Sequence, residues 1–266
     1  MKKTLIINDC EKNNFYFCDT VEHCNIDIKE NNFCFDDIIL VVKKIIEYEN
    51  KDFNQFVIKC PINCINYLSI TLSFLFYTKE LNIIICTDIN SASEWVQKRD
   101  RGVGVALREH YYNGFSLLPI THSGNNFQKD NFHKSIPESV RGLLTDLSFE
   151  TKNDSYNITF YESQMDQCTL ENEKHNIFII DSYQNGKISL PEEKLIKVAQ
   201  SNPVFITGLN PAKGIDNNIT YLHHNGIFFV SIFNKYQLFV LLKIIYEYAD
   251  KELREKVTSL INYNFY

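Results

Sequence analysis

The sequence predicts an α/β fold with a mainly parallel sheet flanked by helices, of the Rossmann-like or flavodoxin-like kind. In the last hundred residues, short apolar segments of strand length alternate with amphipathic segments of helix length. The segment Asn82–Cys86 (NIIIC) is almost entirely apolar, as is typical of strands buried on both faces of a parallel sheet. Hydrophobic residues make up 44% of the 266 residues, enough to bury one large core or two smaller ones.

In the first 150 residues, strands are predicted where short apolar runs are bounded by polar residues. These runs are Thr4–Ile7, Phe15–Cys18, Phe33–Phe35, Gln55–Lys59, Asn82–Cys86 and Phe115–Thr121. Helices are predicted behind start signals. Asp36 begins a helix through Tyr48, because an acidic residue suits the positive end of a helix. Ser91 and Glu94 form a capping box, and Pro137 at a first helical position begins a short helix through Leu147.

The segment Pro61–Thr78 carries no charged side chain, so its length and apolarity raise the possibility of a membrane span. Asn63, Asn66 and several hydroxyl residues dilute the run. A helix buried in a protein core has the same pattern. We therefore expect a buried helix over Ile62–Thr78 and no membrane association.

The last hundred residues alternate regularly between the two element types. Strands are predicted at Asn176–Ile180, Pro203–Thr207 and Ile227–Ile232. Helices are predicted at Pro191–Gln200, Asp216–His224, Asn234–Tyr248 and Lys251–Asn262. This alternation predicts βαβ units and parallel pairing.

A change of composition divides the chain into two halves. Residues 148–176 are polar and acidic and are interrupted only by Ile158–Tyr161, which predicts a linker or an inserted hairpin. The predicted domains are therefore an N-terminal α/β domain over residues 1–150 and a C-terminal α/β domain over residues 174–266.

Charge and cysteine content restrict the possible partners and compartment. The net charge of −6 disfavours nucleic acid and anionic membranes as partners. The chain has eight cysteines, and no secretory signal precedes them. We therefore expect free thiols in a cytoplasmic protein.

No metal or cofactor is predicted. Cys18, His23, Cys24 and Cys34 could in principle ligate zinc, but their spacing matches no usual finger, and buried or exposed free thiols are favoured. Gly102–Val103–Gly104 resembles the start of a dinucleotide fingerprint, but Leu107 stands where its third glycine belongs.

Residues 174–250 resemble the second half of a response-regulator receiver domain. The likeness rests on a strand that ends at Asp181, a helix, a strand that ends at Thr207, and a further helix–strand–helix sequence. The resemblance implies that Asp181 is a phosphoryl acceptor and that Thr207 senses the phosphoryl group. Two family features are missing, because Ser231–Ile232–Phe233 replaces the Lys-Pro pair and no acidic pair for Mg²⁺ stands near the first strand.

A second possible site combines a histidine with a cysteine. His122 lies in the Thr121–Gly124 segment after a predicted strand and resembles the histidine loop of caspase-like cysteine peptidases. Such chemistry needs a thiol that gives its proton to the histidine. The candidate thiols are Cys168, which lies in a polar segment, and Cys86, which ends an apolar strand.

The sequence-based functional hypothesis is a non-enzymatic regulatory or signalling module on a receiver-like scaffold, with a protein as its partner. It rests on the lack of a convincing catalytic set and of a phosphate-binding glycine loop. The alternative is a Cys–His hydrolase that uses His122 with Cys168 or Cys86. The oligomeric state is left open.

Overall fold

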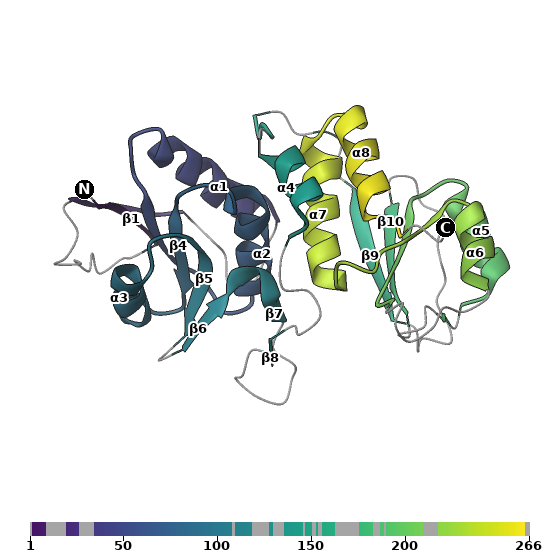
Figure 1. Cartoon of the computed structure of the whole chain (residues 1–266), viewed down its shortest axis with the longest axis horizontal. Coiled ribbons are helices and arrows are strands. Elements are labelled where there is room, and N and C mark those ends of the chain that lie inside the picture. The colour runs from purple at the N-terminus through teal and green to yellow at the C-terminus, as the bar shows by residue number, and fades with distance from the viewer. Residues whose placement is uncertain are drawn as a thin grey trace. The chain divides into compact units, whose positions relative to one another are not determined.

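The chain forms two compact units, residues 1–145 and 146–266, each built around its own mainly parallel sheet (Figure 1). The computed structural model describes residues 2–8, 20–26, 35–107, 110–118, 128–129, 136–145, 147–150, 153, 156–162, 176–182, 187–188, 190–209 and 218–263. The predicted α/β class with mainly parallel sheets is confirmed.

The first sheet has six strands in the order β2-β1-β3-β4-β5-β6. The strands are β1 (Lys3–Ile7), β2 (Thr20–Cys24), β3 (Gln55–Lys59), β4 (Asn82–Cys86), β5 (Gly102–Leu107) and β6 (His110–Asn113). All neighbouring strands pair in parallel except β5 and β6. A 3-10 turn η1 (Gly114–Ser116) and the short antiparallel pair β7 (Leu117–Leu118) and β8 (Gln128–Lys129) follow.

Helices cover both faces of the first sheet. They are α1 (Phe35–Glu49), α2 (Ile65–Phe76) and α3 (Ile89–Lys98). A further helix, α4 (Glu138–Leu144), contacts α2. α3 packs on one face over Ile6, Val57 and Ile84, whereas α1 and α2 contact each other on the other face (Figure 1). The crossover β3–α2–β4 and the crossover β4–α3–β5 each step the chain one strand across the sheet in the same direction. Their helices, however, lie on opposite faces of the sheet. One of them must therefore be of the rare left-handed kind.

α2 is buried on nearly all sides although it contains several polar residues. Three of its hydroxyls donate to the helix's own carbonyls: Ser69 to Asn66, Thr71 to Tyr67 and Ser73 to Ser69. These bonds satisfy the hydroxyls without water, so the helix can enter the core. Among the described residues, no helix is long and apolar enough to cross a membrane.

β5 is a strand that its glycines concealed from sequence analysis. Gly102 has φ +104°, and a Cβ on Gly104 would lie 2.1 Å from the Tyr111 ring of β6. The ring of Tyr111 therefore lies across Gly104. Gly104 serves the close packing of two strands and Gly102 supplies a positive φ, so the pair does not begin a dinucleotide site.

The second sheet has four parallel strands in the order β12-β11-β10-β9. They are β9 (Asn157–Glu162), β10 (Asn176–Asp181), β11 (Val204–Thr207) and β12 (Ile227–Phe229). β9 lies inside the segment expected as a linker or hairpin, but it pairs in parallel with β10, which a hairpin cannot do. Its apolar residues join the second core, because Tyr161 packs against Phe178.

Two helix pairs cover the second sheet. They are α5 (Glu192–Ala199) with α6 (Asn218–His224) on one face, and α7 (Lys235–Tyr248) with α8 (Lys251–Ile261) on the other (Figure 1). Phe178, Ile180 and Ile206 pack against α5 and α6. α7 begins with a complete capping box, because Asn234 and Gln237 exchange side-chain and backbone hydrogen bonds.

Some predicted boundaries differ from the structure. α3 begins at Ile89 with Asp88 as N-cap, before the expected capping box at Ser91. The strand expected over Phe115–Thr121 is a 3-10 turn followed by β7, in the part that the structure describes. The expected strand Phe15–Cys18 lies outside the described residues.

Candidate functional site

The carboxyl ends of the parallel strands define one edge of each sheet, and ligands of open α/β sheets bind at such edges. In the first sheet, β1 lies between β2 and β3, and the chain goes to β2 on one side before α1 carries it to β3 on the other. The strand order therefore reverses between β1 and β3. This switch point is where a crevice is expected from topology alone.

Asn8 follows β1 at this edge and joins the ends of three strands. Its φ of 66° is left-handed, a conformation that asparagine tolerates better than most residues. Its backbone N donates at 2.8 Å to the carbonyl of Cys24, the last residue of β2. Its side-chain Oδ1 accepts at 2.6 Å from the backbone N of Ile26, which follows β2. Its Nδ2 donates to Lys59 O of β3 at 3.3 Å. Asn8 thus holds both sides of the switch point in register.

The loop after β3 presents neutral groups at the same edge. Cys60 N donates to Cys86 O at 2.9 Å, which keeps the loop beside the end of β4. Ile62 is 45% exposed, and Asn63 is exposed as well. The residues from Cys60 to Cys64 carry no charge, so the loop favours a neutral group over an ionic one.

The loop leads directly into the first turn of α2. Cys64 is the N-cap, but its side chain does not cap the helix, because its Sγ lies 3.3 Å from Asn63 Oδ1. No acidic residue stands in the first turn. The N-cap side chain therefore leaves the positive end of the helix uncapped at this edge.

Asn66 lies in that first turn and is only 5% exposed. Its Oδ1 has no hydrogen-bond partner among the described residues. A buried amide oxygen without a partner is rare in a native protein, and functional sites are one place where it occurs. Together with the uncapped first turn, Asn66 marks the start of α2 as the candidate site.

Three thiols lie close to this edge but are sealed from solvent. Cys60, Cys64 and Cys86 are between 0% and 4% exposed. Burial raises the pKa of the Cys60 thiol well above its ordinary value, and the neighbouring Cys64 and Cys86 raise it further. Since the thiolate is the reactive form, Cys60 is an inert core residue.

Burial predicts how these thiols respond to an alkylating reagent. In native protein at pH 7.5, iodoacetamide should leave Cys60, Cys64 and Cys86 unmodified, and all three should react after unfolding in urea. Peptide mass spectrometry measures both states. Rapid alkylation of Cys86 in the native protein would contradict the buried position found here.

Of the Cys–His pairs proposed from the sequence, the structure describes only Cys86. Cys86 is 0% exposed, its Sγ lies 3.7 Å from Ile58 O, and it is packed under α3. His122 and Cys168 lie outside the described residues. A nucleophile must meet its substrate in an open cleft, so Cys86 cannot serve as one in this conformation.

A metal site is not found where the structure can test for one. Within the described ranges, no group of three or more His, Cys, Asp or Glu side chains is placed to hold a metal ion. His23 and Cys24, two of the possible zinc ligands, lie on β2. Cys18 and Cys34 lie outside the described residues.

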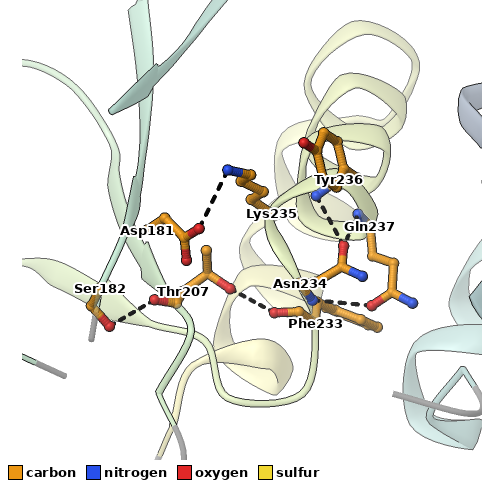
Figure 2. A network of polar contacts seen from close by, with 8 residues as sticks. All are labelled: Asp181, Ser182, Thr207, Phe233, Asn234, Lys235, Tyr236 and Gln237. Carbon is orange, nitrogen blue, oxygen red and sulfur yellow. Dashed lines mark hydrogen bonds and ion pairs between the residues drawn. The ribbon is translucent and has the colours of Figure 1, made fainter. Parts of the chain in front are cut away.

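Asp181 and Thr207 meet at the carboxyl edge of the second sheet, where they are partners in the β10–β11 register (Figure 2). Lys235, the first residue of α7, places its Nζ 3.4 Å from Asp181 Oδ2. Gly208 follows Thr207 with φ +85°, and a Cβ there would lie 2.9 Å from Asp181 Oδ1. The fold therefore brings together the two residues predicted from the sequence, and it adds Lys235, whose contact with Asp181 the sequence did not indicate.

The hydrogen bonds of this network join loops to one another (Figure 2). Thr207 Oγ1 donates to Phe233 O at 2.6 Å, and Ser182 Oγ donates to Thr207 O at 2.8 Å. The Asn234 side chain accepts from the first-turn amides of α7, so that helix end is already capped. These contacts hold the ends of β10, β11 and β12 together. The phospho-acceptor role of Asp181 stays an untested prediction.

No protein-family model and no curated protein sequence matches this chain. Solved structures do match it. The thermostable L-asparaginase from Thermococcus kodakarensis superposes with a TM-score of 0.69 at 14% identity, covering 99% of this chain and 100% of that one. The fold is that of the L-asparaginases.

Two further structures agree. A probable cytoplasmic L-asparaginase from Campylobacter jejuni gives a TM-score of 0.69 at 12% identity, over 99% of this chain and 100% of its own. L-asparaginase I from Vibrio cholerae gives a TM-score of 0.63 at 12% identity, covering 98% of this chain and 97% of its own. The likeness therefore extends over both units.

These matches correct the functional reading of the sequence. The receiver resemblance is wrong, because the structural neighbours are L-asparaginases along the whole chain. Successive parallel strands with intervening helices are common to many α/β folds, so their order over residues 174–250 was not specific. The non-enzymatic signalling module and the caspase-like hydrolase are overturned with it, since the neighbours are enzymes of another kind.

Asn8 and the start of α2 were not predicted from the sequence as parts of a site. One signal was present: Asn8 and Cys60 each follow an apolar strand directly. Strand-end residues of a parallel sheet meet at one edge, but which strands are neighbours depends on the strand order. That order was not predicted. The expected protein partner stays a prediction.

Proposed function

We propose that this chain is an amidohydrolase that acts on the side-chain amide of L-asparagine or of a similar small molecule. The observation that carries the proposal is the similarity to three L-asparaginases over 98–99% of this chain. A likeness confined to one unit would be compatible with many α/β proteins, because such units recur with unrelated functions. Here both units and their order along the chain correspond.

The start of α2 offers what amide hydrolysis needs most. Attack on an amide carbon puts negative charge on the carbonyl oxygen, and fixed N–H donors stabilise that charge. The first turn of α2 has no side-chain cap and no acidic residue. Its position at the β1–β3 switch point supports a role in binding the substrate carbonyl or carboxylate.

The neighbouring side chains suit a neutral amide. Asn63 and Asn66 each carry a group that accepts and a group that donates, which matches both ends of a substrate amide. Exposed Ile62 adds an apolar contact. We assign these residues to recognition of the amide, and Asn8 to holding the two strands that carry them.

A cytoplasmic location is part of this proposal. Free thiols at Cys24, Cys60, Cys64 and Cys86 support it, because thiols stay reduced in the cytosol. The Campylobacter jejuni neighbour, a probable cytoplasmic L-asparaginase, supports it as well.

The test is release of ammonia from L-asparagine and L-glutamine by the purified full chain, with aspartate or glutamate followed by NMR. Asn63→Leu should lower kcat/KM on the order of tenfold or more, because an amide contact to the substrate is lost. Asn54→Leu is the matched control, since Asn54 is also exposed but lies at the opposite end of β3. Its kcat/KM should equal that of the unmodified protein.

Two results would contradict the proposal. One is the absence of ammonia release from either substrate and from simple amides, in protein whose thermal unfolding is intact. The other is an equal loss of activity in Asn63→Leu and Asn54→Leu, which would remove the start of α2 from the site.

A further inference from the structure

The last residues of the described chain cover the free edge of the second sheet. Among the described strands, β12 pairs only with β11, and Val230 N donates to Ile206 O at 2.8 Å on that side. The peptide groups of a strand alternate in direction, so Phe229 faces the other way. There Phe229 N donates to Asn262 Oδ1 at 3.0 Å, and Tyr263 N donates to Phe229 O at 2.6 Å. The backbone N–H and C=O of Phe229 that face the sheet edge therefore both have hydrogen-bond partners.

His223 of α6 is in contact with the same asparagine. Its Nε2 lies 3.0 Å from Asn262 Nδ2. The orientation of the Asn262 amide is not free, because its Oδ1 must accept from Phe229 N. Nδ2 therefore faces His223 and donates, so Nε2 must accept. An imidazole nitrogen accepts only when it carries no proton, which fixes His223 as neutral in this arrangement.

We propose that Asn262–Tyr263 is an acid-released cover on the edge of β12, held in place by neutral His223. Protonation of His223 puts an N–H donor on Nε2 against the N–H donor of Asn262. The amide cannot turn round to accept from His223 without presenting its NH₂ to Phe229 N. The hydrogen bonds of Phe229 to residues 262 and 263 are then lost together, and the edge of β12 is uncovered.

The surroundings of His223 favour the neutral ring. Burial holds its pKa below the ordinary value, and the neighbouring His224 lowers it further. The His224 ring lies 6.1 Å away, and its Nδ1 lies 2.6 Å from Thr220 O on the same helix. Asn262, which contacts His223 from the end of α8, carries no titratable group.

The direction of the pH effect follows from these contacts. The covered form holds His223 with a lowered pKa, and the uncovered form lets it return to an ordinary one. The cover is therefore fully held above the ordinary histidine pKa. It is lost progressively as the pH falls below that value.

The test is amide hydrogen exchange of the full chain, measured by NMR at pH 7.5 and pH 5.0 and expressed as protection factors. In the unmodified protein, protection of the Phe229 and Tyr263 amides should fall on the order of tenfold at pH 5.0, the loss of about one hydrogen bond's stability. Protection of Ile179, in the middle of the sheet, should not change.

Three variants separate this mechanism from general acid destabilisation. His223→Gln keeps an acceptor for Asn262 but does not titrate, so its protection at Phe229 should be the same at both pH values. His224→Gln is the matched control. Because His224 lowers the pKa of His223, its removal should move the acid effect to slightly higher pH, but the loss of protection between pH 7.5 and pH 5.0 should be as large as in the unmodified protein. Asn262→Asp offers acceptors to both Phe229 N and a protonated His223, so it should abolish or reverse the acid effect.

The proposal is overturned if Phe229 and Ile179 lose protection in parallel, since the whole unit would then be opening. It is also overturned if the His223→Gln protein loses protection at pH 5.0 as the unmodified protein does. If His223→Gln does not fold, Asn262→Asp decides the question alone: an acid effect of unchanged size and sign would contradict the mechanism.

Discussion

Lys243→Met is expected to destabilise the second unit by about 3–5 kcal/mol, because it leaves a carboxylate buried without its partner charge. Glu247 of α7 is 1% exposed, and its Oε1 lies 2.6 Å from Lys243 Nζ. The same ammonium donates to Tyr156 O at 2.9 Å, ahead of β9. Removing Lys243 therefore breaks an ion pair and a tie between α7 and the start of β9.

Lys251→Met is the matched control. Lys251 and Glu255 form a pair with the same helical spacing on α8, but their side chains are 80% and 67% exposed. Exposed pairs contribute about 0–1 kcal/mol, so this change should be nearly neutral. The double change Lys243→Met with Glu247→Leu should be less damaging than Lys243→Met alone, because it removes both charges.

The two units can be followed separately during urea unfolding. The only tryptophan, Trp95, lies in the first unit, so its fluorescence reports that unit, whereas circular dichroism reports both. Lys243→Met should move the unfolding transition of the second unit to lower urea concentration. Circular dichroism detects this transition, and Trp95 fluorescence does not. Equal destabilisation by Lys243→Met and Lys251→Met would show that burial of the first pair does not matter.

Gly208→Ala should destabilise the same unit by about 3 kcal/mol, the sum of backbone strain and a steric clash. Gly208 has φ +85°, which costs any residue with a Cβ about 1–2 kcal/mol. An added Cβ would also lie 2.7 Å from Ser182 O, a backbone atom that cannot move freely. The substitution should push apart the loops that Ser182 and Thr207 hold together.

Gly226→Ala measures the cost of the backbone strain without the steric clash. Gly226 has φ +83°, but nothing lies within 4 Å of an added Cβ. Its cost should therefore be about 1–2 kcal/mol from the backbone alone. Urea unfolding of both variants gives the difference. A loss in Gly208→Ala no greater than in Gly226→Ala would contradict the close approach of the β10 and β11 loops.

The fold class could be read from the sequence because buried parallel strands leave a strong pattern. NIIIC, NIFII and the apolar core of PVFIT are strands in the structure at or near their predicted bounds. β2 (TVEHC) was missed because it is polar and only partly buried. β5 was missed because its glycines, which make room for Tyr111 in the case of Gly104, weaken the strand pattern.

The candidate site could not be predicted from the sequence in the same way. Asn8, Asn63 and Asn66 come from two segments, and they belong to one edge only because β1 and β3 are neighbours. Strand order depends on long-range packing that local pattern does not encode. Asp181 and Thr207 were found because consecutive strands of the second sheet are also neighbours, so sequence order and spatial order agree there.

The central claim is that a small amide binds at the switch point between β1 and β3 of the first sheet. Titration of the ¹⁵N-labelled full chain with L-asparagine, followed by NMR, tests it most directly. The amide signals of Asn8, Asn63 and Ile65 should shift together and saturate. If saturating ligand leaves them unmoved, or moves only the signals of Asp181, Thr207 and Lys235 in the second unit, the account is contradicted.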